Sequence, residues 1–260
     1  MNFKNKVNFS NTQIRAKARF LLDENVFGRD WMKSVVIMFL MTLIVSSTGG
    51  VLYSLSNVYL LPFLMSTFGG LSPVLRIVIP IVLEILEVLM LNIFLGPLAV
   101  GMASVHLDLV RGDGRIRIRK FFEGFKGFFD NFLIGFMYTL HITLWSLLLI
   151  VPGIYVAYSY ALVFHVKKDN PSFRWQQCVD ESERLMQGNR WRLFKLQCSF
   201  IGWTFLGLIL FFPFGALWVG PYSQTSTALF YEQVKAEKSN ALLGIIGKAT
   251  NSDFINFSIG

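Results

Sequence analysis

Long apolar runs without charged residues dominate the hydrophobic pattern of this chain, and short polar segments separate them. A helix needs about 20 apolar residues to cross the roughly 30 Å of hydrocarbon in a bilayer. On this criterion the sequence predicts six membrane spans, at residues 34–55, 76–100, 131–151, 153–168, 194–212 and 215–233. The fourth is expected to be short, because its charge-free run extends only from Gly153 to Val166 and is followed by Lys167 and Lys168. The pattern therefore predicts an all-α membrane protein.

Charge predicts the orientation of these spans. Twenty-three of the 24 Lys and Arg residues lie in four blocks. One block precedes the first span, one lies between the second and third, one lies between the fourth and fifth, and one follows the sixth. Only Arg76 lies at the opposite ends of the spans. Short loops rich in Lys and Arg are retained in the cytoplasm during insertion. We therefore expect three hairpins with both termini in the cytoplasm, and a cytoplasmic C-terminal tail at 234–260.

Three pairs of Gly and Pro are expected to interrupt the helices. Pro152-Gly153 is predicted at the tip of the second hairpin, because proline ends a helix and glycine permits any backbone angle. Gly96-Pro97 and Gly220-Pro221 lie inside the second and sixth spans, where each proline removes a helical hydrogen bond. Such interruptions surround the substrate sites of some transporters, although kinks also serve packing alone.

Amphipathic stretches predict three cytoplasmic helices lying along the membrane surface, at about 10–27, 116–130 and 172–188. The clearest is 116–130, which places a row of phenylalanines on one face and Arg119, Lys120 and Lys126 on the other. We expect these three basic residues to contact lipid headgroups. The alternative is that the phenylalanine face seals the cytoplasmic base of the bundle.

Each amphipathic stretch precedes a hairpin, which suggests a threefold repeat of one surface helix and two spans. Gly127 lies 25 residues before Pro152, and Gly188 lies 25 residues before Pro213. Gly is frequent in this chain, so such spacing also arises by chance.

Composition supports the same class of protein. Apolar residues make up 53% of the chain, including 26 Phe, which is more than an aqueous core of this size uses. The net charge of +8 is explained by orientation and by attraction to anionic lipids of the inner leaflet, so nucleic acid is not an expected partner. The bilayer itself is the expected partner, with a second membrane protein or a second copy of the chain as further options.

Several motifs in the second half of the chain resemble those of a known family. They are residues 144–154, Tyr158-Ser159-Tyr160, Asp169-Asn170-Pro171, residues 182–194, residues 199–203, Gly220-Pro221-Tyr222 and Phe230-Tyr231-Glu232. In this order they resemble a bacterial integral-membrane family known as domain of unknown function nine-seven-five, over about residues 121–233. A fainter likeness, in hydropathy and hairpin layout, is to the membrane domain fused to some glycerophosphodiester phosphodiesterases.

The resemblance implies a polytopic protein of the bacterial cytoplasmic membrane, mostly from Gram-positive species, without an established activity. It carries over no catalytic residue. The first hairpin is assigned from hydropathy, because its likeness rests on little more than Ala16-Lys17 and Gly96-Pro97-Leu98.

Polar residues inside the predicted spans are the candidate site. Glu84 and Glu87 share one face of the second span, where a charged side chain is costly unless it faces water or a partner. His141 lies at mid-depth of the third span. Polar side chains of the last two spans reach similar depth, and they are Gln197, Ser199, Tyr222 and Gln224. These residues outline a polar path, or they form interhelical hydrogen bonds that only hold the bundle together.

Enzyme motifs are not found in the sequence. It contains no GxSxG, HExxH, Walker or GxGxxG pattern, and its three His residues lack the spacing of a metal site. We expect neither a metal nor a cofactor.

Three functions remain, and the leading one is a non-enzymatic envelope protein that binds or moves a small polar or lipidic substrate. The second is an interaction, scaffold or self-protection protein that acts through a partner, and the third is a lipid-headgroup enzyme. If the acidic pair lines the path, replacing Glu84 and Glu87 with Gln should abolish the first function without affecting folding.

Overall fold

The computed structural model describes residues 10–22, 28–68, 73–112, 115–211 and 215–257, and within these residues it contains helices and turns without β-strands. The α-helices are α1 (Asn11–Leu21), α2 (Arg29–Tyr53), α3 (Leu61–Phe68), α4 (Pro73–Arg111), α5 (Ile118–Phe121), α6 (Phe128–Leu148), α7 (Ile150–Ser159), α8 (Val163–Asp169), α9 (Trp175–Met186), α10 (Arg190–Phe211) and α11 (Gly215–Phe257). A π-helix, η2 (Ser54–Leu60), joins α2 to α3, and a 3-10 helix, η3 (Phe122–Phe125), follows α5. The all-α prediction is confirmed.

Four helical stretches of the described residues are long and apolar enough to cross a membrane. They are Arg29–Thr67, Ile77–Arg111, Phe128–Leu148 and Ile150–Asp169. These stretches contain or overlap the first four predicted spans. The other two predicted spans fall in α10 and α11, and part of their apolar sequence lies outside the described residues, as does the side chain of Arg76.

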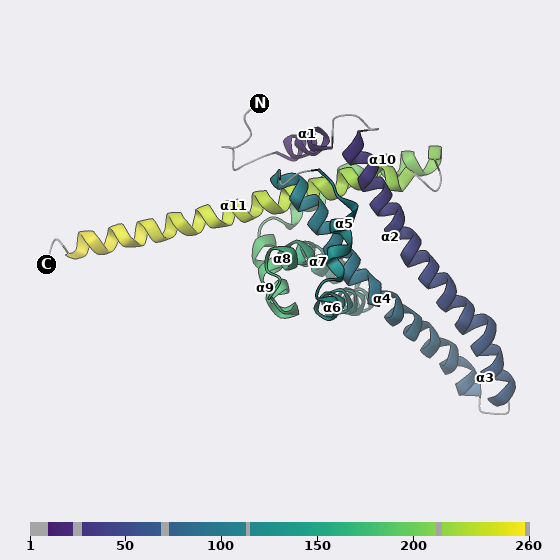
Figure 1. Cartoon of the computed structure of the whole chain (residues 1–260). Helices are drawn as coiled ribbons and strands as arrows, with labels where there is room; N and C mark the ends of the chain where they lie inside the picture. Colours follow the sequence, from purple (N-terminus) through teal and green to yellow (C-terminus); the bar gives the residue numbers. More distant parts are fainter. Residues whose placement is uncertain (1–9, 23–27, 69–72, 113–114, 212–214, 258–260) are drawn as a thin grey trace.

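Three helix pairs leave a shared body in different directions (Figure 1). The first pair is α2 through α3 with α4, the second is α6 with α7, and the third is α10 with α11. Helix α4 lies at the centre of this arrangement, because it contacts α2, α6, α8 and α11. The distal part of α11 extends away from the body, so the helix continues past residue 233, where the predicted tail begins.

Close crossings of α4 explain the small residues in its middle. A Cβ atom added to Gly96 would lie 2.0 Å from the backbone oxygen of Asn131, and one added to Gly135 would lie 2.4 Å from Gly96 Cα. Helices α4 and α6 can approach this closely only because both positions are glycine. Gly96 therefore serves packing.

The predicted hairpin tip at Pro152-Gly153 is misplaced, and the two Gly-Pro pairs of the second and sixth spans do not end their helices. Helix α4 continues through Pro97 and α11 continues through Pro221, so neither Gly-Pro pair ends its helix. The tip between α6 and α7 is Leu149, with an extended backbone at φ −159° and ψ 142°, and Pro152 lies in the first turn of α7. Proline is tolerated there because the first backbone N–H groups of a helix need no intrahelical acceptor. Gly153 instead allows close contact, since its added Cβ would lie 2.7 Å from Ser146 Cα.

The apolar faces of α1 and α9 are buried inside the protein. Ile14 and Ala18 of α1 and Cys178 and Leu185 of α9 are at most 1% exposed, and they belong to one core cluster with α8, α10 and α11. The prediction that these faces lie on the inner leaflet is therefore wrong, because the protein itself covers them.

The predicted helix at 116–130 is divided into several pieces. Lys126 is extended and Gly127 has a left-handed backbone at φ +70°, which ends η3 and starts α6. Phe121 is fully buried, whereas Phe129 is 75% exposed. The rings of successive phenylalanines nevertheless stack from Phe122 through Phe125, Phe128 and Phe132 to Phe136, with centroids 6.0–6.4 Å apart.

The two glycines that suggested a repeat have similar backbones. Gly127 precedes α6 with φ +70°, and Gly188 precedes α10 with φ +80°. Gly28, which precedes α2, has φ −60°, so the first unit of the suggested repeat lacks a left-handed glycine at this place. The second and third units thus each have a left-handed glycine shortly before their hairpin.

Candidate functional site

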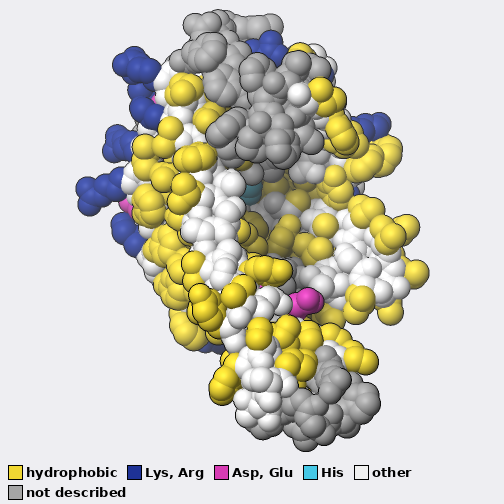
Figure 2. All heavy atoms as spheres, turned by 90° about the vertical axis from the view of Figure 1, so that its right-hand side faces the viewer, with side chains coloured by type: hydrophobic (Ala, Val, Ile, Leu, Met, Phe, Trp, Pro, Cys, Tyr) yellow, Lys and Arg dark blue, Asp and Glu magenta, His cyan; other side chains and the backbone are white. Residues whose placement is uncertain are grey.

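The three helix pairs meet around a cavity of about 710 Å³. Helices α2, α4, α6, α7, α8, α10 and α11 all contribute to its wall. The lining residues are Met38, Met41, Thr42, Val45, Ser46, Leu95, Ala99, Met102, Tyr138, Ala157, Tyr158, Ala161, Phe164, His165, Gln197, Ser223, Gln224 and Thr227. On the face shown in Figure 2 the molecule is hollowed between walls of mainly hydrophobic side chains, and a histidine side chain is visible inside.

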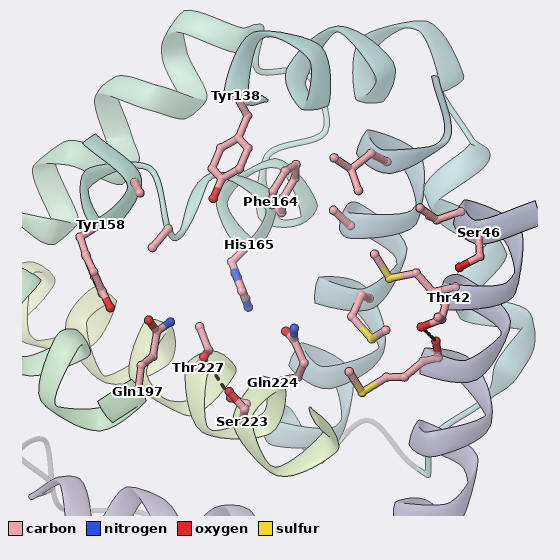
Figure 3. A pocket seen from close by; sticks show the side chains of 18 residues that line it. Thr42, Ser46, Tyr138, Tyr158, Phe164, His165, Gln197, Ser223, Gln224 and Thr227 are labelled. Atoms are coloured by element: carbon pink, nitrogen blue, oxygen red, sulfur yellow. Dashed lines mark hydrogen bonds between the residues drawn. The ribbon is translucent and has the colours of Figure 1, made fainter. Parts of the chain in front are cut away.

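His165 of α8 points into this cavity (Figure 3). The residue is 5% exposed, and neither of its ring nitrogens has a hydrogen-bond partner among the described residues. Its ring packs against Tyr231, with centroids 5.5 Å apart. Buried polar atoms are usually hydrogen-bonded, so the two free nitrogens are available to a bound molecule.

The cavity has a polar side and an apolar side. Gln197 of α10 and Gln224 of α11 lie on the polar side with His165, and Tyr138 and Tyr158 carry hydroxyl groups on other parts of the wall (Figure 3). The mainly apolar side comes from α2 and α4, through Met38, Met41, Val45, Leu95 and Met102, with Thr42 and Ser46 of α2 as its polar residues (Figure 3). Methionine is flexible and polarisable, so this side can adapt to ligands of different shape.

The predicted acidic pair lies apart from the cavity. Glu84 is exposed, and Glu87 is half-buried and accepts a 3.3 Å hydrogen bond from the Ser56 hydroxyl of η2. Glu87 lines a separate groove of about 480 Å³ with apolar residues of the first hairpin. Eight residues separate it from Leu95, the first α4 residue of the cavity, which is about 12 Å along a helix.

Three other predicted residues are engaged in local packing. His141 Nδ1 lies 2.9 Å from the backbone oxygen of Met137, and its ring centroid lies 5.1 Å from that of Trp175. The Ser199 hydroxyl donates to the backbone oxygen of Leu196. The Tyr222 ring packs against two other aromatic rings, and its centroid lies 6.1 Å from that of Trp31 and 4.8 Å from that of Phe200. Of the seven predicted site residues, the structure brings Gln197 and Gln224 together in the cavity.

Sequence reasoning missed His165 as a site residue. It placed His141 in the polar path and considered His106 and His165 only as metal ligands, and the described residues contain no group of three or more His, Cys, Asp and Glu side chains that could hold a metal. The available signal was a histidine in an apolar stretch, seven residues after Tyr158. The turn at Tyr160–Leu162, which aims α8 at the cavity, is not visible in the hydropathy.

An ion-pair network lies at one end of α8. Asp169 accepts hydrogen bonds from Arg111 of α4 at 2.7 and 2.9 Å and from the Tyr231 hydroxyl of α11 at 2.8 Å, and it also pairs with Lys235. Arg111 also binds Glu232 at 2.6 Å. This network holds α4, α8 and α11 together and so fixes the helix that carries His165.

The predicted headgroup residues differ in their surroundings. Arg119 is exposed, and Lys126 is 79% exposed in its pair with Glu123. Lys120 pairs with Asp108 of α4. Lys120 therefore serves the fold, while Arg119 and Lys126 remain accessible.

Both cysteines are free. Burial raises the pKa of the Cys178 thiol to about 11, and nearby Lys167 lowers it by less. Because the thiolate is the reactive form, Cys178 is expected to be inert at neutral pH.

Residues 144–238 match the family model described as Protein of unknown function (DUF975). This match confirms the resemblance seen in the sequence, over a stretch that contains α7, α8, α9 and α10 and the start of α11. It includes His165, Gln197 and Gln224. No curated protein and no solved structure matches the chain.

Proposed function

We propose that this chain crosses the bacterial cytoplasmic membrane six times, with both termini in the cytoplasm. The four apolar helical stretches support the first four crossings. The helical conformation of α10 and α11 and the placement of Lys and Arg support the remaining two and the orientation. Arg119 and Lys126 then face the anionic inner leaflet beside the exposed phenylalanines of the same segment.

Within this topology, the protein binds a small amphipathic molecule in the central cavity and holds it or moves it across the membrane. The observation that carries this function is the buried His165, whose two ring nitrogens have no hydrogen-bond partner among the described residues. A polar group left unbonded in a buried wall costs about 1–3 kcal/mol. A ligand that supplies the missing bonds recovers this energy, so the site favours occupancy.

The acidic pair has no part in this function. Glu84 and Glu87 lie on the first hairpin outside the cavity, so their carboxylates do not reach a ligand bound there. The double variant should bind the ligand as the wild-type protein does.

A cavity-filling substitution tests the function. Ala99 lines the cavity, and Ala99→Trp adds a large side chain to the space that a ligand would occupy. Full-length protein purified in mild detergent should carry about one amphiphile per chain, and Ala99→Trp should reduce this at least tenfold. The bound molecule is extracted and identified by mass spectrometry.

The matched control is Ile81→Trp, at a position of α4 that is 50% exposed and outside the cavity. This variant should retain the bound molecule. If the wild-type protein carries none, or if Ala99→Trp retains it, the binding function is wrong and a scaffold or interaction role is favoured.

A further inference from the structure

His165 differs from the other two histidines of the chain in its hydrogen bonding. His106 lies 3.0 Å from the Ser34 hydroxyl through one nitrogen and 2.9 Å from the backbone oxygen of Met102 through the other. His141 bonds to the backbone oxygen of Met137. His165 alone of the three has two free nitrogens, although it is 5% exposed. Its surroundings therefore define which ligand the cavity selects.

No charged side chain is found among the described residues that line the cavity. Asp169 lies four residues after His165 on α8, and its carboxylate is already bonded to Arg111, Tyr231 and Lys235 outside the cavity. An ionised group buried without a partner of opposite charge is strongly unfavourable. The cavity thus disfavours ligands whose headgroup carries a formal charge, such as phosphates and carboxylates.

The polar side chains supply both donors and acceptors. A neutral imidazole has one of each, and each amide of Gln197 and Gln224 has two donors and an acceptor oxygen. No hydrogen bond within the described residues uses either amide side chain. A hydroxyl or an amide can donate one hydrogen bond and accept another, so ligands that carry these groups match this polar wall.

The opposite wall favours a ligand that carries a hydrocarbon chain. Met38, Met41, Val45, Leu95 and Met102 make it mainly apolar, and of the two polar residues of α2 on this side, Thr42 and Ser46, the Thr42 hydroxyl is already bonded to the backbone oxygen of Met38 (Figure 3). The volume of about 710 Å³ lies within the roughly 300–1,000 Å³ of typical small-molecule sites, and it suits a headgroup with one hydrocarbon chain.

From this arrangement we propose that the ligand is an uncharged amphiphile, whose hydroxyl or amide headgroup binds His165, Gln197 and Gln224 while its hydrocarbon chain lies against the methionines of α2 and α4. This proposal rests on the binding function proposed above and specifies its substrate class.

Two probes that share one chain and differ in headgroup charge test the proposal. They are 1-oleoylglycerol and its phosphate ester, 1-oleoyl lysophosphatidate, each titrated against the full-length protein in a nonionic detergent and followed by native mass spectrometry. The wild-type protein should bind the glycerol ester at least tenfold more tightly than the phosphate ester. His165→Phe keeps a ring but removes both nitrogens, and it should weaken binding of the glycerol ester about tenfold, the effect of losing one or two hydrogen bonds. His165→Asn keeps a donor and an acceptor and should bind more tightly than His165→Phe.

Gln224→Lys provides an independent measurement, because it adds a positive charge to the polar wall. It should reverse the preference toward the phosphate ester. Equal or tighter binding of the phosphate ester to the wild-type protein would overturn the uncharged class while leaving the binding function in place. Unchanged affinities in both His165→Phe and Gln224→Lys would overturn this binding site. If neither probe binds the wild-type protein, this substrate class is wrong, and loss of the co-purified amphiphile in Ala99→Trp then decides separately whether the binding function stands.

Discussion

Asp169 links the end of the helix that carries His165 to two neighbouring helices. Its side chain is 6% exposed and accepts hydrogen bonds from Arg111, Tyr231 and Lys235, which come from two other helices. A buried carboxylate of this kind is stable only while its partners remain in place. The cavity wall is therefore held from outside by a charged network, while the wall itself carries no described charge.

Replacing Asp169 with Asn should lower the free energy of unfolding by about 2–4 kcal/mol. Removing one partner of a fully buried ion pair costs about 3–5 kcal/mol. The expected loss is smaller here because the Arg111 side chain is 29% exposed and is partly screened by solvent. Unfolding in mixed micelles followed by tryptophan fluorescence measures the change.

The control for Asp169→Asn is Glu181→Gln, which removes the carboxylate that pairs with Arg184 on the surface of α9. Exposed pairs contribute less than about 1 kcal/mol, so this variant should be nearly neutral. An equally small effect of Asp169→Asn would show that the network does not fix α8.

At this scale the sequence predicted some residues and missed others for clear reasons. Gln197 and Gln224 were found because polar side chains are rare in apolar helices. Glu84 and Glu87 were ranked above them because carboxylates are costlier in lipid, but they lie on a hairpin that leaves the body. The lateral position of a residue depends on how the helices diverge, and hydropathy gives only depth.

Among the elements, α4 organises the molecule through its small residues. Gly96 and Gly135 let the backbones of α4 and α6 touch, and Gly101 allows the same with the end of α5, where an added Cβ would lie 2.0 Å from the backbone oxygen of Phe121. Small residues at crossings are the usual way for membrane helices to pack closely. This packing sets the distance between the first and second hairpins, and hence the width of the cavity.

Gly96→Leu should force α4 and α6 apart and destabilise the fold by about 1–3 kcal/mol, the usual cost of overpacking. The same mixed-micelle unfolding measures it. Gly202→Leu is the control, since no atom lies within 4 Å of a Cβ at that exposed position of α10. A destabilisation of similar size in both variants would contradict the close crossing.

Helices were easier to predict than their ends and contacts. The apolar runs correctly placed helices over all six predicted spans, because the periodicity and length of a run are local properties. The hairpin tip at Leu149 was missed because Pro152 fits the first turn of α7 as well as it fits a turn. The amphipathic faces of α1 and α9 were assigned to lipid, since a stripe of apolar residues looks the same whether protein or bilayer covers it.

For the whole molecule, the convergence of three hairpins on one cavity is the feature that single elements do not reveal. Every hairpin contributes to the wall, and the family match spans α8, α10 and the start of α11, which carry His165, Gln197 and Gln224. The first hairpin lies outside the match and supplies most of the apolar side. We expect the polar side to set the chemical class of the ligand and the first hairpin to set its shape.

Photo-crosslinking inside living cells tests whether this cavity holds an amphiphile. Tyr138 lines the cavity, and p-benzoylphenylalanine at this position is similar in shape and reacts with neighbouring C–H bonds. The same substitution at Tyr53, which is 60% exposed on α2 and outside the cavity, is the control. We expect one uncharged lipid adduct at position 138 and the mixture of bulk membrane lipids at position 53. No adduct at position 138, or the bulk mixture at both positions, would show that the cavity does not hold a specific amphiphile.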